Sequence, residues 1–231
     1  MVEWQTPEIV HMEETKMKKT WIWMAVAAAV VIVIGAIALL SGGQSSEDTA
    51  DRYENQPYLG EESAEVNIVE FGDYKCPYCK DFESGFFPLI DEQLIQTGDV
   101  KFYFIQYPFI NADSDRSAEF AEVVYEELGN ETFWEFHELM YEKQEPGTEQ
   151  QEVYTEDYLY DTLAEVVSEE EAQSVLTTYQ DGAGEGALDR DLDWAGDWDV
   201  TGTPTLFVNG EKFEGSSIDD LVQMVEEAKS E

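Results

Sequence analysis

The chain contains two cysteines, Cys76 and Cys79, separated only by Pro77 and Tyr78. A Cys-X-X-Cys pair at the start of a helix holds its first sulfur beside unpaired backbone N–H groups, which stabilise a thiolate there. In such motifs the pKa of the first cysteine falls from about 8.5 to between about 3.5 and 7.5. We therefore expect Cys76, facing solvent at the helix end, to be the nucleophile, and Cys79 to be the resolving thiol. The chemistry that this pair predicts is thiol-disulfide exchange.

The cysteine pair alone is also consistent with two other functions. Two thiolates can bind a soft metal such as copper or zinc, which would make the chain a metal-binding surface protein. The two cysteines can equally form a static bridge. A zinc ribbon with four cysteine ligands is excluded, because the chain has only two cysteines.

A second candidate feature is the dipeptide Thr203-Pro204, which stands directly before a predicted strand. Proline is disfavoured in such a position unless its peptide bond is cis or the chain bends there. A cis turn would approach the sulfurs and leave the backbone of Thr203 free to pair with an extended substrate chain. Pro204 would also keep a metal or a stray backbone donor away from the thiols. The alternative is an ordinary loop proline.

The elements that must position these residues begin with a strand over Ala64–Gly72, directly before the cysteines. A helix follows from Cys76, with Pro88 expected to bend or interrupt it. A second strand, Val100–Tyr107, comes next. Strand, helix and strand in this order usually form a right-handed parallel unit.

The rest of the chain is predicted to be a helical insertion at about 113–198, followed by a return to strands. Apolar residues recur at three and four positions through most of the insertion. After it we expect a strand at Thr205–Val208, a turn at Asn209-Gly210, a short strand at Lys212-Phe213 and a final helix at Ser217–Ala228. The fold class is therefore α/β.

The composition narrows the classes of function. The chain has 231 residues, 43% of them hydrophobic, which is enough for a folded domain. It carries 12 Lys and Arg against 52 Asp and Glu, a formal charge of −40, which excludes a nucleic-acid partner because phosphates are repelled. The acidity indicates adaptation to concentrated salt, where self-repulsion is screened; the alternative is a solvated acidic surface with no further meaning.

The N-terminal region predicts export. Residues 21–40 carry no charge and are long enough to span a bilayer as a single helix. Lysines at 16, 18 and 19 precede this run, so residues 1–20 are expected in the cytoplasm and the remainder outside. The alternative is a cleaved signal peptide, with Met17 as a second candidate start. We interpret 41–56 as an acidic flexible tether and 57–231 as the catalytic domain.

Three segments together resemble one family. They are the run from Val69 to Cys79, the Phe133-Trp134-Glu135 stretch of the helical region, and Gly202 to Gly210. They are similar to the DsbA-like thiol-disulfide oxidoreductases, and most of all to the membrane-anchored BdbD type of Gram-positive bacteria. The resemblance implies a thioredoxin fold with a helical domain inserted before the cis-proline segment. It also implies that Glu70 is the buried acid beneath the active site that relays the proton of Cys79; the alternative is an ordinary carboxylate at a strand end.

The function that the resemblance implies is oxidation of exported proteins. The Cys76–Cys79 disulfide would pass to unfolded secreted proteins with free thiols, with no other cofactor. A membrane quinone-linked thiol oxidase of the DsbB or BdbC kind would recharge the enzyme. The Pro77-Tyr78 dipeptide departs from the Pro-His of the most oxidising members, and tyrosine gives the thiolate no positive charge. A disulfide reductase or isomerase therefore stays as the alternative, since potentials of such enzymes run from about −270 to about −120 mV.

One histidine and a cluster of aspartates are weaker candidates for function. His137 lies among aromatic residues at helical spacing and is expected to pack or to lie at the surface. The acidic residues Asp189, Asp191 and Asp193 imitate the start of a calcium loop. Trp194 stands where such a loop needs glycine and Val200 where it needs glutamate, so an EF-hand is excluded. We assign no metal ligand, although calcium bound elsewhere on so acidic a surface stays open.

Overall fold

The computed structural model describes residues 52–230. The predicted cytoplasmic segment, the 21–40 anchor and most of the tether lie outside these residues. Within 52–230 no helix is both long and apolar enough to cross a membrane. Residues from Glu54 onward cluster as one unit, which is described here by itself.

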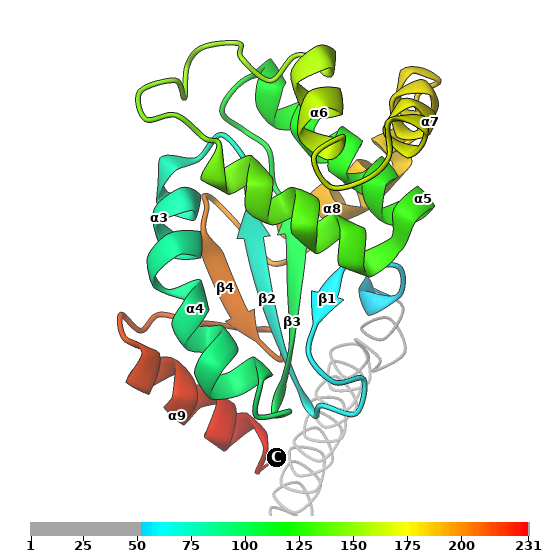
Figure 1. Ribbon diagram of the computed structural model, residues 1–231. Helices are drawn as coiled ribbons and strands as arrows, with labels where there is room; N and C mark the ends of the chain where they lie inside the picture. Colours follow the sequence, from blue (N-terminus) through cyan, green and yellow to red (C-terminus); the bar gives the residue numbers. More distant parts are fainter. Residues whose placement is uncertain (1–51, 231) are drawn as a thin grey trace, which may run out of the picture. The chain divides into compact units, whose positions relative to one another are not determined.

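From the strand before the cysteines onward, the elements follow the predicted order; a short strand, Tyr58–Leu59, that was not predicted precedes them (Figure 1). The elements are β1 (Tyr58–Leu59), β2 (Val66–Gly72), α3 (Pro77–Gly85), α4 (Phe87–Ile90), the π-helical segment η1 (Asp91–Ile95), β3 (Val100–Gln106), α5 (Ala112–Glu142), α6 (Glu156–Leu163), α7 (Glu169–Gln180), α8 (Glu185–Asp197), β4 (Thr205–Val208), β5 (Glu211–Lys212) and α9 (Ile218–Ala228).

The five strands form one sheet in the order β1-β3-β2-β4-β5. β2 and β3 are parallel, which confirms the predicted strand-helix-strand unit. β4 pairs antiparallel to β2 although about 130 residues separate them in the chain, and it brings the segment before Thr205 to the end of β2 where the cysteines lie. β5 covers Glu211–Lys212, one residue earlier than expected.

Alternation along the strands places helices on both faces of the sheet. Ile68, Phe102 and Leu206 belong to an apolar core that also contains residues of α3, α4, η1 and α9. On the opposite face the ring of Phe71 makes edge contacts with Trp194 of α8 and with Trp198, which follows it. The two tryptophans therefore serve packing.

The first helix begins where the sequence indicates. Cys76 is the N-cap residue of α3, and Pro77 occupies the first turn, where its missing N–H costs nothing. The helix is interrupted at Phe86, between α3 and α4. Pro88 lies two residues later, in the first turn of α4, and cannot donate to the carbonyl four residues earlier, so the helix is interrupted there as predicted.

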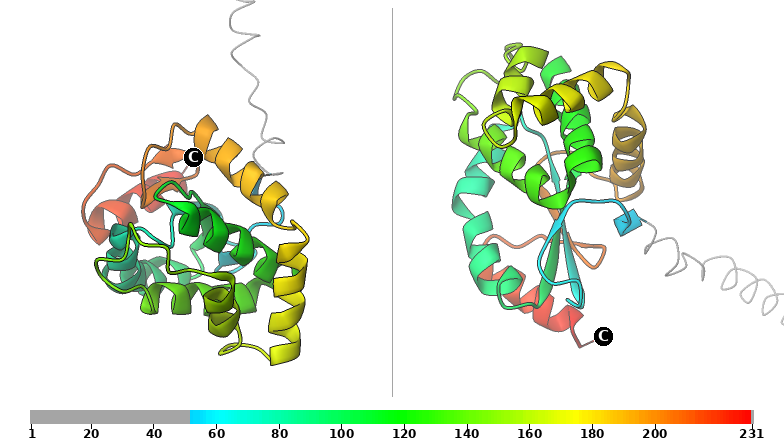
Figure 2. Two further views of the ribbon diagram at one scale, coloured as in Figure 1. Left: turned by 90° about the horizontal axis from the view of Figure 1, so that it is seen from above. Right: turned by 45° about the vertical axis from the view of Figure 1, so that its right-hand side comes forward.

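The insertion comprises α5 to α8: in the right-hand view of Figure 2, α5, α6 and α7 lie above the strands, whereas Trp194 packs α8 against the face of the sheet that carries Phe71. Its first helix is capped by Asn111, whose side chain accepts from the N–H of Asp113. Gly129 interrupts this helix with φ 84° and ψ −177°, a conformation that other residues rarely adopt. α5 therefore consists of two helical halves that run in different directions.

One expectation, the end of the tether, needs correction. Gln56, placed in the tether, is buried, and its side chain donates to Asp191 at 2.6 Å, so the folded domain begins before residue 57. The three aspartates at 189, 191 and 193 lie on α8 and not in a loop. Because helical backbone cannot wrap around an ion, this segment does not have the form of a calcium loop.

Candidate active site

The two cysteines lie just after the carboxyl end of β2. Cys76 is only 3% exposed and Cys79 is fully buried. The expectation that Cys76 faces solvent is therefore wrong: its side chain is almost fully buried, because its sulfur lies against the segment that precedes β4. Tyr78, at 70% exposure, is the part of the motif that is open to solvent.

The peptide bond between Thr203 and Pro204 is cis, as predicted. The Cys76 thiol donates to the carbonyl oxygen of Thr203 at 3.5 Å, across 127 positions of sequence. The fold thus brings the cis-proline turn onto the sulfur of Cys76. Pro204 also borders a surface groove of about 400 Å³, whose apolar lining residues are Phe82, Phe86, Leu206 and Phe213.

The surroundings of the two sulfurs differ. The pKa of Cys76 is lowered to about 6: the hydrogen bond with the Cys79 thiol contributes most, the N–H groups of Cys79 and Tyr78 act in the same direction, and burial opposes them. Burial, with the same thiol bond and the charge of Glu70, raises the pKa of Cys79 well above its usual value. One sulfur therefore ionises near neutral pH while the other keeps its proton.

Glu70 lies on β2, buried, on the same face of the strand as Ile68. Burial raises the pKa of its carboxyl well above the usual range, and the charges of Glu83 and Cys76 raise it further. One of its oxygens, Oε2, is buried with no hydrogen-bond partner in the described residues. A carboxyl in this state can hold a proton near Cys79 at neutral pH.

The close packing behind the site depends on Gly72. A Cβ at this position would lie 2.2 Å from Cε2 of Phe104 and 3.2 Å from the hydroxyl of Tyr141. The strand end can therefore approach these rings only because residue 72 has no side chain.

Sequence reasoning missed one residue that holds the active-site turn. Gln144, in the loop after α5, is buried, and its Nε2 donates to the carbonyls of Tyr74 at 2.7 Å and of Cys76 at 3.1 Å. The hydroxyl of Tyr154 donates to the same Tyr74 carbonyl. No sequence signal marks Gln144, because its partners are main-chain atoms about 70 positions away.

Lys75 was also missed, although it stands directly before Cys76. Its ammonium is buried, donates to the carbonyls of Thr148 and Gln151, and lies 3.5 Å from the carboxylate of Asp113. It also lies over the ring of Tyr154. Together with Gln144, this ammonium ties the active-site turn to the loop between α5 and α6.

His137 lies in an aromatic cluster and serves packing there. It is 1% exposed and packs edge-on against Phe104 and Trp134, with Nδ1 3.1 Å from the Tyr74 hydroxyl. Within residues 52–230 no group of three or more His, Cys, Asp and Glu side chains could hold a metal ion.

Asp191 and Glu122 form a pair of buried acids. Burial raises the pKa of Asp191 to about 7, and burial together with the charge of Asp191 raises that of Glu122 well above its usual value. Asp191 accepts hydrogen bonds from the Gln56 side chain and the N–H of Gln106. No local pattern predicts this pair, because Glu122 and Asp191 lie on helices far apart in the chain.

Comparison with known proteins agrees with this geometry. The sequence profile of the family described as Thioredoxin matches residues 52–227. The disulfide bond formation protein D of Bacillus subtilis is 36% identical over 172 residues, which are 74% of this chain and 76% of that protein. A probable disulfide bond formation protein D of Bacillus cereus is 34% identical over 184 residues, 79% of this chain and 84% of the relative.

Solved structures show the same relationship. The crystal structure of oxidised BdbD from Bacillus subtilis superposes with a TM-score of 0.70 at 33% identity, covering 77% of this chain and 95% of that one. Chlamydia trachomatis DsbA superposes with a TM-score of 0.64 at 19% identity, which shows the fold alone, over 77% of this chain and 93% of that one. With its cysteine pair, its cis-proline turn and these relatives, the chain belongs to the disulfide bond formation protein D family of thioredoxin-fold thiol-disulfide oxidoreductases.

Proposed function

We propose that the chain acts outside the cytoplasm as a dithiol oxidase that passes the Cys76–Cys79 disulfide to secreted proteins. The observation that carries the proposal is the asymmetry of the sulfurs: the pKa of Cys76 is lowered to about 6 and that of Cys79 is raised. At neutral pH the reduced pair keeps a stable anion on Cys76. Stabilising the reduced form makes the disulfide an oxidant.

The reaction follows from the positions of the groups. A substrate thiolate attacks Sγ of Cys76, the bond to Cys79 breaks, and a mixed disulfide joins the substrate to Cys76. The electron pair of the broken bond stays on the sulfur of Cys79, which takes the proton held by Glu70. A second substrate thiolate then attacks the substrate sulfur of the mixed disulfide. The substrate leaves oxidised, and Cys76 leaves this step as the thiolate.

The substrate chain is expected to lie beside the cis-proline turn. The backbone of Thr203 lies next to the reacting sulfur, and the groove beside Pro204 offers apolar surface for flanking side chains. Pro77 positions the start of α3, and Tyr78 presents an exposed ring at the mouth of the site. These features support a flexible polypeptide as substrate.

Recharging and location complete the proposal. The relatives named disulfide bond formation protein D support a membrane thiol oxidase, of the quinone-linked DsbB or BdbC kind, as the partner that takes two electrons from the reduced pair. The uncharged run at 21–40 supports anchoring in the same membrane, with the catalytic domain outside.

The reduction potential of the purified full chain tests the proposal. We expect a value closer to about −120 mV than to about −270 mV, together with oxidation of a reduced, unfolded substrate protein. A Cys76→Ser variant is expected to lose all transfer, whereas Cys79→Ser is expected to trap mixed disulfides. A potential near that of thioredoxin, with efficient insulin reduction, would establish the reductase alternative that Tyr78 in place of histidine keeps open.

A further inference from the structure

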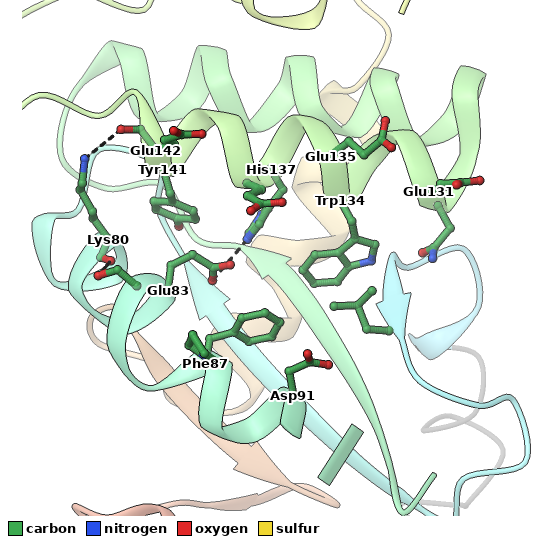
Figure 3. A pocket seen from close by; sticks show the side chains of 15 residues that line it. Lys80, Glu83, Phe87, Asp91, Glu131, Trp134, Glu135, His137, Tyr141 and Glu142 are labelled. Carbon is green, nitrogen blue, oxygen red and sulfur yellow. Dashed lines mark hydrogen bonds and ion pairs between the residues drawn. The ribbon is translucent and has the colours of Figure 1, made fainter. Parts of the chain in front are cut away.

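One cavity lies apart from the sulfurs, between α3 and α4 on one side and the second half of α5 on the other (Figure 3). Its volume is about 850 Å³, within the range of ligand sites. None of Cys76, Cys79, Thr203 and Pro204 lines it. We name this cavity the α3–α5 groove.

The floor of the α3–α5 groove is aromatic. Trp134 hangs from α5 towards Phe87 of α4, and the two rings are parallel within 7° with centroids 6.5 Å apart (Figure 3). Tyr141 lines the same cavity further along α5. Faces of such rings attract guanidinium and ammonium groups, and tryptophan does so best.

The rim of the groove is acidic on both sides. Its carboxylates are Glu83, Asp91, Glu131, Glu135, Glu138 and Glu142. The one lysine of the lining, Lys80, already donates to the main-chain carbonyls of Glu142 and Gln144. Within the described part of the chain, Glu131, Glu135 and Glu138 form no ion pair. The rim therefore has a surplus of negative charge.

Two buried N–H groups of the lining lack an acceptor. Nε1 of Trp134 and Nε2 of His137 have no hydrogen-bond partner in the described residues, although His137 is 99% buried. Nε2 of His137 faces the Glu83 carboxylate at 3.7 Å across the groove, beyond hydrogen-bond distance (Figure 3). This carboxylate favours the tautomer that carries the proton on Nε2, with Nδ1 accepting from Tyr74. Buried donors without acceptors are costly, and a ligand can supply what they lack.

The chemistry of the occupant follows from these groups together. Carboxylates and ring faces alone would suit a simple cation, and unpaired N–H groups alone would suit an acceptor. A peptide segment with arginine side chains presents both, because its backbone carbonyls accept and its guanidinium groups bind carboxylates and ring faces. We propose that the α3–α5 groove binds an arginine-bearing peptide segment of a partner protein, at a surface separate from the redox site.

Binding of a defined probe to the full chain tests this proposal. The probe is a short fluorescent peptide of alternating arginine and leucine, measured by anisotropy, with a glutamine-for-arginine peptide as its neutral counterpart. The protein carries Cys76→Ser and Cys79→Ser, so that no mixed disulfide contributes. We expect binding of the arginine peptide and none of the glutamine peptide. Equal binding of the two peptides, or binding of neither, would overturn the proposal.

Two sets of charge variants locate the site. Glu131→Gln, Glu135→Gln and Glu138→Gln combined, all at exposed positions of the groove, should weaken binding about tenfold. The matched control, Asp161→Asn, Glu169→Gln and Glu170→Gln, removes three exposed charges from α6 and α7 and should change binding less than about threefold. Equal weakening by the two sets would show that only the net charge attracts the peptide.

A third comparison examines the aromatic floor and the kind of ligand. Trp134→Phe keeps a ring but removes the N–H donor, and we expect about threefold weaker binding. Unlabelled arginine amide should compete only at far higher concentration than the peptide. If the amide competes as well as the peptide, the groove binds a small organic cation. If the chain forms dimers that the arginine peptide dissociates, the groove binds a second copy of the chain. Either result rejects the peptide proposal.

Discussion

Thr203 meets Cys76 through its main-chain carbonyl and not through its side chain, whose hydroxyl has no hydrogen-bond partner in the described residues. The contact therefore depends on the backbone conformation at position 203 more than on the residue type. Gln144 differs, because its side-chain Nε2 donates to the carbonyls of Tyr74 and Cys76, so this contact depends on the residue type at position 144. The active-site turn is thus held by one main-chain carbonyl and one side chain from two distant segments.

The role of Glu70 can be tested by Glu70→Gln, which keeps the shape of the side chain but removes its titrating proton. Because a buried acid with a raised pKa can supply the proton to the departing Cys79, we expect oxidation of substrate to slow by about tenfold or more. Stopped-flow rates measured against pH, with exposed Glu65→Gln as control, give the comparison. An unchanged rate and pH profile would make Glu70 a structural carboxyl.

Gln144→Leu examines the clamp on the active-site turn. The variant leaves the Cys76 carbonyl without its side-chain donor, so we expect a loss of about 1 to 2 kcal/mol in the free energy of unfolding. We also expect the pKa of Cys76 to rise above about 6, because its sulfur is held less firmly beside the N–H groups of Cys79 and Tyr78 that stabilise the thiolate. This pKa is measured by following the absorbance of the thiolate at about 240 nm against pH.

The exposed neighbour Gln150→Leu serves as the control for Gln144→Leu. A loss of stability in Gln144→Leu without a change in the thiol titration would show that Gln144 only supports the loop. No change in either quantity would mean that the hydrogen bonds to the Tyr74 and Cys76 carbonyls are not maintained in solution.

At the scale of elements, the kink of α5 depends on one residue. Gly129→Ala places a side chain at φ 84° and ψ −177°, where no neighbouring atom lies within 4 Å of the new Cβ, so the expected loss of about 1 to 3 kcal/mol comes from the backbone alone. Gly196→Ala, inside α8 and equally open, should instead stabilise by about 0.5 to 1 kcal/mol. Denaturant unfolding measures both, and changes of the same sign would contradict the assignment.

Local patterns were sufficient for the elements around the motif. The strand 205–208 was predicted with its observed bounds, and β2 and β3 within two residues, because short apolar and aromatic runs that end at glycine or proline are local signals. The parallel pairing and the meeting of Pro204 with Cys76 followed from the resemblance and the order of elements. The clamps by Gln144 and Lys75 could not be predicted, since a buried side chain bound to a distant carbonyl leaves no periodic pattern. The family places Glu70, but only burial in the structure explains its raised pKa.

At the scale of the whole molecule, the buried acids predict a stability that depends on pH. Asp191 has a folded pKa of about 7 and an unfolded value of about 3.9, so the folded state binds its proton more tightly. Its ionisation destabilises the fold above about pH 7, and this cost disappears as the pH falls towards about 4. Thermal unfolding in chelating buffer should therefore show higher stability at pH 5.5 than at pH 8.

Asp191→Asn isolates this contribution from the general repulsion among acidic side chains. The variant should show a clearly smaller gain in stability between the two pH values than the unmodified chain. Exposed Asp189→Asn, on the same helix, should leave the gain unchanged. If all three proteins gain equally, the pH dependence arises from surface charge and not from the buried pair.

The charge of the chain makes a separate prediction about salt. With a formal charge of −40, repulsion between carboxylates is strong in dilute buffer and weak at about 1 M salt, where the screening length is about 3 Å. We expect the midpoint of thermal unfolding to rise with salt and cooperativity to decline in dilute buffer. Full cooperativity in dilute buffer would contradict the adaptation to concentrated salt that the composition indicates.

The position of the insertion in the sequence has a consequence for biosynthesis. Cys76 and Cys79 are translated more than 120 residues before Thr203 and Pro204, and the strand that carries this turn joins the sheet beside β2. During synthesis both thiols therefore leave the ribosome before the Thr203-Pro204 segment that contacts Cys76 has been made. The active site is complete only when nearly all of the described residues have been made. A truncated product would therefore contain the cysteine pair but lack the cis-proline turn.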